Sequence, residues 1–317
     1  MPPPAPPNSS FSLRTPQLQL GLDSTSLGAF KLCPRKYYYE IVEGWTGRSG
    51  KPDLEFGIWL HQAREEYERG LAAGGGHEEV LSAVLQSLLF KTWDSDLGRP
   101  WTSDHPVKNR TTLVQTVVWY LDELAQNDPL ETVQLANGQP AVELSFRFDS
   151  GLRSRKGEAF ILCGHLDRIA TLGDSPVQHY VVDIKTTKSA LDQRFFAGFS
   201  PDNQMSLYTI AGAVVFGLPI DGVIIDGIQV GAGFARFARS PIRRTASLSD
   251  EWLEDLSWWV AQLEHCADAQ MWPMNDKACG LYGGCAFRPV CSRPPSARPQ
   301  WLVANFVRRT WVPLQPR

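Results

Sequence analysis

Two short stretches, Gly164-His165-Leu166-Asp167-Arg168-Ile169 and Tyr180-Val181-Val182-Asp183-Ile184-Lys185-Thr186-Thr187, decide how this chain of 317 residues is interpreted. Both are rich in apolar and β-branched residues, so each predicts a β-strand. If the two strands are neighbours, Asp167 and Asp183 can hold a hard divalent cation through oxygen. Lys185 then lies on the same strand face as Asp183, where it can orient a water. The pattern predicts metal-assisted hydrolysis of a phosphate ester.

The segments around these stretches add to that prediction, because an acid-X-Lys triplet alone is expected about once by chance in such a chain. Glu143 lies upstream in an alternating polar and apolar run, which predicts a further strand and places an acid near the metal. Downstream, Gln204 and Tyr208 are four residues apart in a predicted helix, so they share one helical face. Predicted strands lie at about 140–149, 158–171, 178–186 and 222–244, and predicted helices at about 54–72, 77–93, 110–127 and 249–268.

In this order the motifs resemble those of the PD-(D/E)XK nucleases, specifically the RecB-like branch that includes recombination exonucleases and CRISPR-adaptation nucleases. The resemblance covers about residues 24 to 293. Five motifs carry it: Ser26 to Tyr39, Gly57 to His61, Gly164 to Asp167, Asp183 to Lys185, and Gln204 to Tyr208. It implies an α/β fold with a PD-(D/E)XK, restriction-endonuclease-like core in the order αβββαβ. It also implies a site that binds Mg²⁺ or Mn²⁺ through His61, Asp167, Asp183 and the carbonyl of Ile184.

Six cysteines extend the resemblance. In the resembling nucleases one early and three late cysteines hold a 4Fe–4S cluster, which implies Cys33, Cys279, Cys285 and Cys291 as ligands here. The gap between Cys279 and Cys285 is five residues, where many relatives have two, so zinc remains the alternative occupant. No basic and apolar leader precedes the cysteines, so we expect a cytoplasmic protein in which metal ligation is favoured over disulfides. The metal would clasp the two ends of the domain together.

The formal net charge of −3 means that DNA contact has to come from local patches. Arg236, Arg239, Arg243 and Arg244 form the best such cluster, although a solvated basic hairpin explains them equally well. No apolar run approaches the roughly 18 residues that a membrane span needs. We therefore expect DNA, presented as ends or single strands, as the partner. The sequence does not identify protein partners in a recombination or CRISPR-adaptation complex.

The chain divides into three parts by composition. A Pro-rich segment at 1–20 is expected to be disordered, and 296–317 is expected to be a C-terminal tail. Between them, 21–295 is expected to be one nuclease domain, with a helical insert at 54–130 and the cysteine cluster at 279–291.

The function expected from these features is metal-dependent DNA cleavage by an exonuclease in recombination, repair or phage DNA metabolism. Asp167, Asp183, Lys185, His61, Glu143, Gln204 and Tyr208 are the expected catalytic residues. Three alternatives remain: a DNA-end-binding iron–sulfur protein with little turnover, a CRISPR-adaptation nuclease, and a non-nuclease metalloprotein in which the four cysteines carry the activity.

Overall fold

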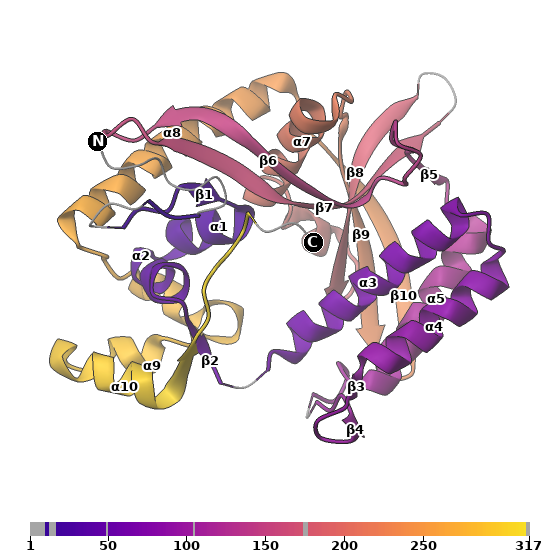
Figure 1. The fold of residues 1–317 in the computed structure, drawn as a ribbon, viewed down its shortest axis with the longest axis horizontal. Helices are drawn as coiled ribbons and strands as arrows, with labels where there is room; N and C mark the ends of the chain where they lie inside the picture. The colour runs from indigo at the N-terminus through magenta and orange to yellow at the C-terminus, as the bar shows by residue number, and fades with distance from the viewer. Residues whose placement is uncertain (1–9, 13–16, 49, 104, 174–176, 315–317) are drawn as a thin grey trace. The chain divides into compact units, whose positions relative to one another are not determined.

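The computed structural model describes residues 10–12, 17–48, 50–103, 105–173 and 177–314 (Figure 1). The chain forms two compact units, each assembled from separate segments. Unit 1 consists of Met1–Gly50, Ser145–Gly164 and Ala246–Arg317, and unit 2 of Lys51–Leu144 and His165–Thr245. The single nuclease domain expected at 21–295 stays a prediction. The two long strands β6 (Val142–Arg153) and β7 (Ala159–Leu172) contribute residues to both units.

Unit 2 contains a mixed β-sheet in which β8 (Gln178–Thr187) has neighbours on both sides. It pairs antiparallel with the second half of β7 and parallel with β9 (Gly222–Gly231). β10 (Phe234–Arg243) continues the sheet antiparallel to β9, and β5 (Leu130–Thr132) pairs with β7. A parallel pair needs a crossover connection, which here contains α6 (Gln193–Ala197) and α7 (Asn203–Phe216).

Helices cover both faces of this sheet. α3 (Pro52–Ala72), α4 (His77–Lys91) and α5 (Arg110–Asn127) lie together beside β9 and β10 (Figure 1). Phe56, Leu60 and Tyr67 of α3 share a buried core with Ile184 of β8. Residues 181, 183 and 185 point to the other face, where Val181 lies beside α7 at Gly212. A small hairpin, β3 (Trp93–Asp94) with β4 (Arg99–Pro100), follows α4.

The helices of unit 2 begin and end at residues with clear capping chemistry. Asn109 caps α5 by accepting the N–H of Thr112 at 3.0 Å. Asp202 caps α7 by accepting the N–H groups of Gln204 and Met205 at 2.7 and 3.1 Å. Gly217 ends α7 with a φ of 64°, a left-handed conformation that glycine adopts without steric cost. Asp202 and Gly217 thereby fix the two ends of α7, the helix that carries Gln204 and Tyr208.

Unit 1 is held together largely by aromatic side chains. Its first helix, α1 (Ser24–Leu32), starts with a capping box between Asp23 and Ser26, and α2 (Pro34–Tyr37) leads into a π-helical turn at Tyr38–Val42. The rings of Tyr37 and Trp272 have centroids 5.6 Å apart, and Phe30 packs edge-on against both. The other elements of unit 1 are β1 (Gly21–Leu22), β2 (Trp45–Gly47), α8 (Ala246–Ala269), two 3₁₀ helices (Asp276–Gly283 and Pro295–Ala297), α9 (Arg288–Cys291), α10 (Arg298–Asn305) and β11 (Phe306–Arg308). Among the described residues, no helix is both long enough and apolar enough to cross a membrane.

Both predicted tails contain ordered structure. Residues 1–9 and 13–16 of the N-terminal tail lie outside the described part of the chain, but Phe11 forms a β-bridge with Gln19. Gln19 also accepts the hydroxyl of Tyr37 at 2.6 Å, and Leu18 is buried. Residues 18–20 are buried as an extended segment, and the disorder expected at 1–20 stays a prediction. At the other end, residues 298–308 form α10 and β11, which pairs with β2.

A buried ion network joins the elements of unit 2. The carboxylate of Asp128, just after α5, lies 3.1 Å from the guanidinium of Arg168 on β7, 3.6 Å from that of Arg64 on α3 and 2.5 Å from that of Arg239 on β10. Arg239 also pairs with Asp226 of β9 at 2.9 Å. Two carboxylates thus neutralise Arg239, whose side chain is 22% exposed, so it offers less free charge for DNA contact than the sequence indicated.

The first prediction concerns this network. Asp128→Ala should lower the free energy of unfolding by about 3 kcal/mol, because three buried guanidinium groups then share only the carboxylates of Glu68 and Asp226. The matched control is Arg69→Ala, which breaks an exposed pair with Glu65 on α3 and should cost about 0.5 kcal/mol or less. Urea unfolding followed by circular dichroism measures both. Equal losses for the two variants would show that the network contributes no special stability.

Candidate active site

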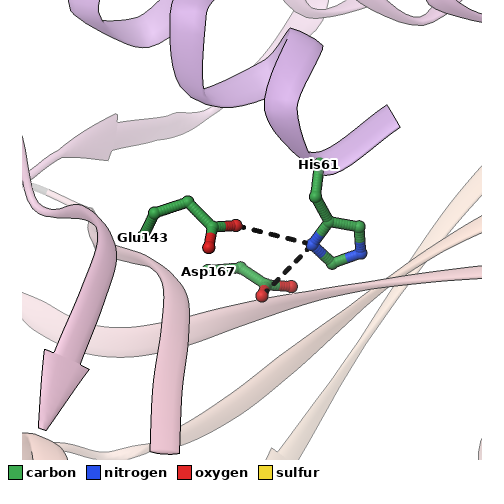
Figure 2. Close-up of side chains that lie close together, drawn as sticks. All are labelled: His61, Glu143 and Asp167. Carbon is green, nitrogen blue, oxygen red and sulfur yellow. Dashed lines mark ion pairs between the residues drawn. The ribbon is translucent and has the colours of Figure 1, made fainter. Parts of the chain in front are cut away.

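Three side chains that offer metal-binding atoms meet in unit 2 (Figure 2). Nδ1 of His61 lies 3.2 Å from Oδ1 of Asp167 and 3.7 Å from Oε1 of Glu143. One ligand atom from each residue lies within 4.8 Å of the other two. We call these three residues the ligand triad. Among the described residues it is the one group of three or more His, Cys, Asp or Glu side chains this close together.

Each member of the ligand triad comes from a different element. His61 follows Leu60 in α3, whose buried face anchors the helix in the core of unit 2. Asp167 follows the fully buried Leu166 in β7, so the strand alternation turns its carboxylate away from the side that Leu166 packs against. Glu143 is the second residue of β6 and has a φ of 46°, which is rare for a residue other than glycine. Strain of this kind persists where the surrounding structure requires it, often at functional sites.

The charges of the ligand triad depend on one another. Burial opposes protonation of His61, but the carboxylates of Asp167 and Glu143 outweigh burial and raise the pKa of His61 to about 10. Burial also favours the neutral form of Asp167, whereas His61, Lys185 and the N–H of Ile184 lower the pKa of Asp167 below its usual value. A metal ion needs the lone pair of the neutral imidazole, so it has to displace a proton from His61. Metal binding here should therefore strengthen as the pH rises towards 10.

A second set of side chains begins on the neighbouring strand. Nζ of Lys185 lies 2.8 Å from Oδ2 of Asp183 and donates a hydrogen bond to Oε1 of Gln204 at 2.8 Å. Nε2 of Gln204 in turn donates to the hydroxyl of Tyr208 at 2.8 Å. Asp183 and Lys185 of β8 and Gln204 and Tyr208 of α7 are thus joined by consecutive polar contacts. We call these four residues the lysine chain.

The lysine chain keeps Lys185 charged. Burial disfavours its ammonium, but the carboxylates of Asp183 and Asp167 outweigh burial and raise the pKa of Lys185. Burial raises the pKa of Asp183 to about 6, an effect that Lys185 opposes and Asp167 reinforces. At neutral pH Lys185 is therefore a hydrogen-bond donor and a positive charge, and does not act as a base.

The ligand triad and the lysine chain meet between β7 and β8. The N–H of Ile184 donates to Oδ2 of Asp167 at 2.9 Å, which ties the strand of Lys185 to the carboxylate of the triad. The arrangement differs in detail from the metal ligands expected from the sequence. Glu143 completes the close group with His61 and Asp167, whereas Asp183 pairs with Lys185, and Ile184 contributes its N–H to Asp167.

Some residues beside the triad were not singled out from the sequence. A void of about 10 Å³, about enough for one water, is lined by the ligand triad together with Arg64, Tyr120 and Arg168, among other side chains. Arg168 follows Asp167 directly, and Arg64 lies three residues after His61 on the same helical face. That spacing is the signal in the sequence that could have identified them. Through these arginines, the buried ion network reaches the wall of the site.

The four cysteines expected to bind a cluster all belong to unit 1. Sγ of Cys33 accepts the N–H of Asn275 at 3.4 Å, and the N–H of Cys285 donates to the carbonyl of Cys279 at 3.0 Å. Burial raises the pKa of the Cys291 thiol; Arg35 opposes the rise, while the nearby thiols of Cys285 and Cys33 contribute to it. The sulfurs of three or more of these cysteines do not lie within 4.8 Å of one another.

The sequence and the fold were compared with known proteins. The family model described as the PD-(D/E)XK nuclease superfamily matches residues 24–292. Among solved structures, a candidate exonuclease from Eubacterium rectale is similar with a TM-score of 0.49 and 10% identity, over 82% of this chain and 86% of that one. The crystal structure of a protein called SSO0001 is similar with a TM-score of 0.31 and 12% identity, over 77% of each chain. No curated protein matches the sequence significantly.

The second prediction separates the two roles of Glu143. Glu143→Gly and Glu143→Ala both remove the carboxylate, so both should bind Mn²⁺ at least tenfold more weakly than the unmodified protein, as measured by calorimetry. Only glycine relieves the positive φ, so the Gly variant should be more stable than the Ala variant by about 1 kcal/mol. Urea unfolding without metal measures that difference. Unchanged Mn²⁺ affinity in both variants would exclude Glu143 as a ligand.

Proposed function

Because the chain belongs to the PD-(D/E)XK nuclease superfamily, we propose that it is a metal-dependent deoxyribonuclease of the RecB-like branch, which degrades DNA from ends or as single strands. The observation that carries this proposal is the meeting of the ligand triad and the lysine chain at β7 and β8, through the hydrogen bond from Ile184 to Asp167. One group can hold a metal and the other presents a fixed positive charge beside it. In metal-assisted hydrolysis of a phosphodiester, both stabilise the negative charge that develops.

The ligand triad fits Mg²⁺ or Mn²⁺, because it combines two carboxylates with one imidazole and borders a void of about 10 Å³. We propose that Asp183 and the carbonyl of Ile184 complete the set of ligands, as the resemblance implies. When bound, the ion would lower the pKa of a water and neutralise charge on the scissile phosphate. Because the triad members come from α3, β6 and β7, its geometry is held by three packed elements.

The lysine chain supplies the remaining chemistry. We propose that the ammonium of Lys185 donates a hydrogen bond to the attacking water or to a phosphate oxygen, where negative charge builds up during hydrolysis. Asp183 and Gln204 hold that ammonium from two sides at 2.8 Å each. Tyr208 fixes the amide of Gln204 and thereby its orientation. The donor is thus positioned before the substrate arrives, so little reorganisation is needed during the reaction.

The preference for ends or single strands rests on the sequence, in which we recognise no motif that reads base edges in a groove. Such a nuclease would act in recombination, repair or phage DNA metabolism. CRISPR adaptation is the alternative pathway, because that group of nucleases shares the same motifs.

The third prediction tests this function. Lys185→Ala should reduce DNA cleavage about 100-fold to 1000-fold, the usual effect of removing a donor that stabilises developing charge. Asp183→Ala should reduce it similarly. The control Lys91→Ala removes a lysine that pairs with Glu66 and should cut normally. Cleavage of end-labelled linear duplex, single-stranded DNA and closed circular DNA is measured with Mg²⁺, with Mn²⁺ and in EDTA.

Each substrate and condition answers a separate question. We expect cleavage of linear or single-stranded DNA with either metal and none in EDTA. Full activity in EDTA would reject the metal mechanism. Rapid cutting of closed duplex circles would reject the exonuclease, and a Lys185→Ala variant with unaltered rate would reject the site.

We further propose that Cys33, Cys279, Cys285 and Cys291 hold a 4Fe–4S cluster, with zinc as the alternative. Both Cys285 and Cys291 pack against a core that includes Tyr39 and Phe306, so these two cysteines lie where the early and late segments of unit 1 meet. A 4Fe–4S cluster binds one thiolate at each of its four iron atoms, so its cysteine sulfurs lie further apart than those around one zinc ion. Its role would be to join these segments.

The fourth prediction concerns this cysteine site. Cys33→Ser and Cys285→Ser should each lose iron and sulfide and lower the melting temperature by a similar amount, because either change opens the same clasp. Cys266→Ala is the control, since this buried thiol belongs to unit 1 but not to the proposed site. Metal analysis and thermal unfolding of anaerobically purified protein provide the readouts. Stoichiometric zinc without iron would favour the alternative, and Cys33→Ser with unchanged metal would exclude Cys33.

A further inference from the structure

Basic side chains gather in unit 2 where β8 ends, outside the ligand triad and the lysine chain. Lys188 directly follows Thr187, the last residue of β8, and its side chain is exposed. Nζ of Lys188 lies 3.1 Å from Nε2 of His105, which belongs to the segment before α5. Lys108, in the same segment, donates from Nζ to the hydroxyl of Thr186 at 2.6 Å. We call His105, Lys108 and Lys188 the basic cluster.

The contact between His105 and Lys188 brings two hydrogen-bond donors together. The backbone N–H groups of Val107 and Lys108 both donate to Nδ1 of His105, at 3.1 and 2.8 Å, so this nitrogen is an acceptor. Nε2 must then carry the ring proton, and it faces the ammonium of Lys188. Two donors at 3.1 Å do not satisfy each other. An anion placed against both would accept a hydrogen bond from each.

Lys108 adds a positive charge below the surface. Its side chain is 1% exposed, and its ammonium lies over the ring of Phe56, 4.4 Å from the centroid. Burial lowers the pKa of Lys108 to about 8, Asp53 opposes the change and the nearby Lys188 adds to it. Among the ion pairs of the described residues, none involves Lys108 or Lys188. Lys108 and Lys188 are therefore held outside ion pairs, and Asp53 only partly offsets the effect of burial on Lys108.

The basic cluster lies close to the proposed chemistry. Lys188 is three residues after Lys185, and at about 3.3 Å per residue their backbones are at most about 10 Å apart. Thr186, which Lys108 contacts, directly follows Lys185. The side chains of Lys185 and Thr186 point to opposite faces of the sheet, so a DNA strand held at Lys185 has to pass the end of β8 to reach Lys188.

We propose that His105 and Lys188 bind a backbone phosphate of the DNA strand a few nucleotides from the bond that is cut, with Lys108 contributing charge from beneath. This rests on the proposed function, because it takes DNA as the substrate. The subsite recognises phosphate and not bases, so it holds the strand without sequence preference. It increases affinity for the strand and fixes which bond reaches the lysine chain.

The fifth prediction tests the subsite by binding, without need of cleavage. Anisotropy of a labelled single-stranded oligonucleotide is titrated with protein in EDTA at several KCl concentrations. Lys188→Ala should reduce the slope of log K against log salt by about 0.7, the value for one lost phosphate contact on a single strand. Lys188→Arg should keep the slope, because it keeps the charge. The control Lys91→Ala removes the same charge where Glu66 already neutralises it, and should leave the slope unchanged.

A second measurement identifies the phosphate itself. Oligonucleotides with one neutral methylphosphonate linkage, moved stepwise along the strand, are tested against the unmodified protein, Lys188→Ala and His105→Ala. A methylphosphonate at one position should weaken binding of the unmodified protein. It should have little effect on either variant, because the side chain that contacts this phosphate is already absent. If every position affects the variants and the unmodified protein equally, or the salt slope of Lys188→Ala is unchanged, the subsite is rejected.

The outcomes separate the subsite from the proposed function. A protein that cuts DNA normally but has an unchanged salt slope in Lys188→Ala would retain the nuclease function and lose the phosphate subsite. A protein that binds with the expected slopes but cuts no DNA with Mg²⁺ or Mn²⁺ would retain the subsite and lose the nuclease function. A protein that binds no DNA at any salt concentration would overturn both.

Discussion

The arrangement of unit 2 depends most on the ion pairs that the carboxylate of Asp128 forms with three arginines. This carboxylate faces guanidinium groups from α3, β7 and β10, and Arg239 links it onward to Asp226 on β9. Buried charges are costly to desolvate, so this group is stable only when all of these elements are in place. Two of the arginines, Arg64 and Arg168, are close in sequence to His61 and Asp167. The network thus sets the separation between α3, which carries His61, and β7, which carries Asp167.

The candidate site is held by contacts of different kinds. His61 is placed by a helix packed on the sheet, Glu143 by a strained backbone, and Lys185 by the hydrogen bond that it donates to Gln204 of α7. No single element holds all of them. Pre-organisation of this kind limits the movement needed when a substrate binds. It also concentrates buried charge in a small volume, which accounts for the shifted pKa values of His61 and Asp183.

Much of the fold could be predicted from periodicity and capping residues. The strands β6 to β9 and the helices α3 to α5 lie within a few residues of the predicted ranges, because alternation and helical spacing are strong in these segments. The family motifs likewise identified side chains that converge, such as Lys185 with Gln204. Ion pairs between residues far apart in the chain could not be predicted from the sequence. Arg239 seemed available to DNA because nothing local reveals that Asp128, 111 residues away, neutralises it. The positive φ of Glu143 and the burial of Leu18 also depend on contacts distant in sequence.

The discontinuous make-up of the two units has a consequence for how the chain acquires its structure during synthesis. Every segment of unit 2 precedes residue 246, whereas unit 1 needs Ala246–Arg317 as well as the first segment. Unit 2 can therefore form while the last part of the chain is still on the ribosome, but the early aromatic residues of unit 1, such as Phe30 and Tyr37, must wait for Trp272. Contacts across more than 200 residues close slowly. During that interval, the first helices expose apolar surface that a chaperone can bind.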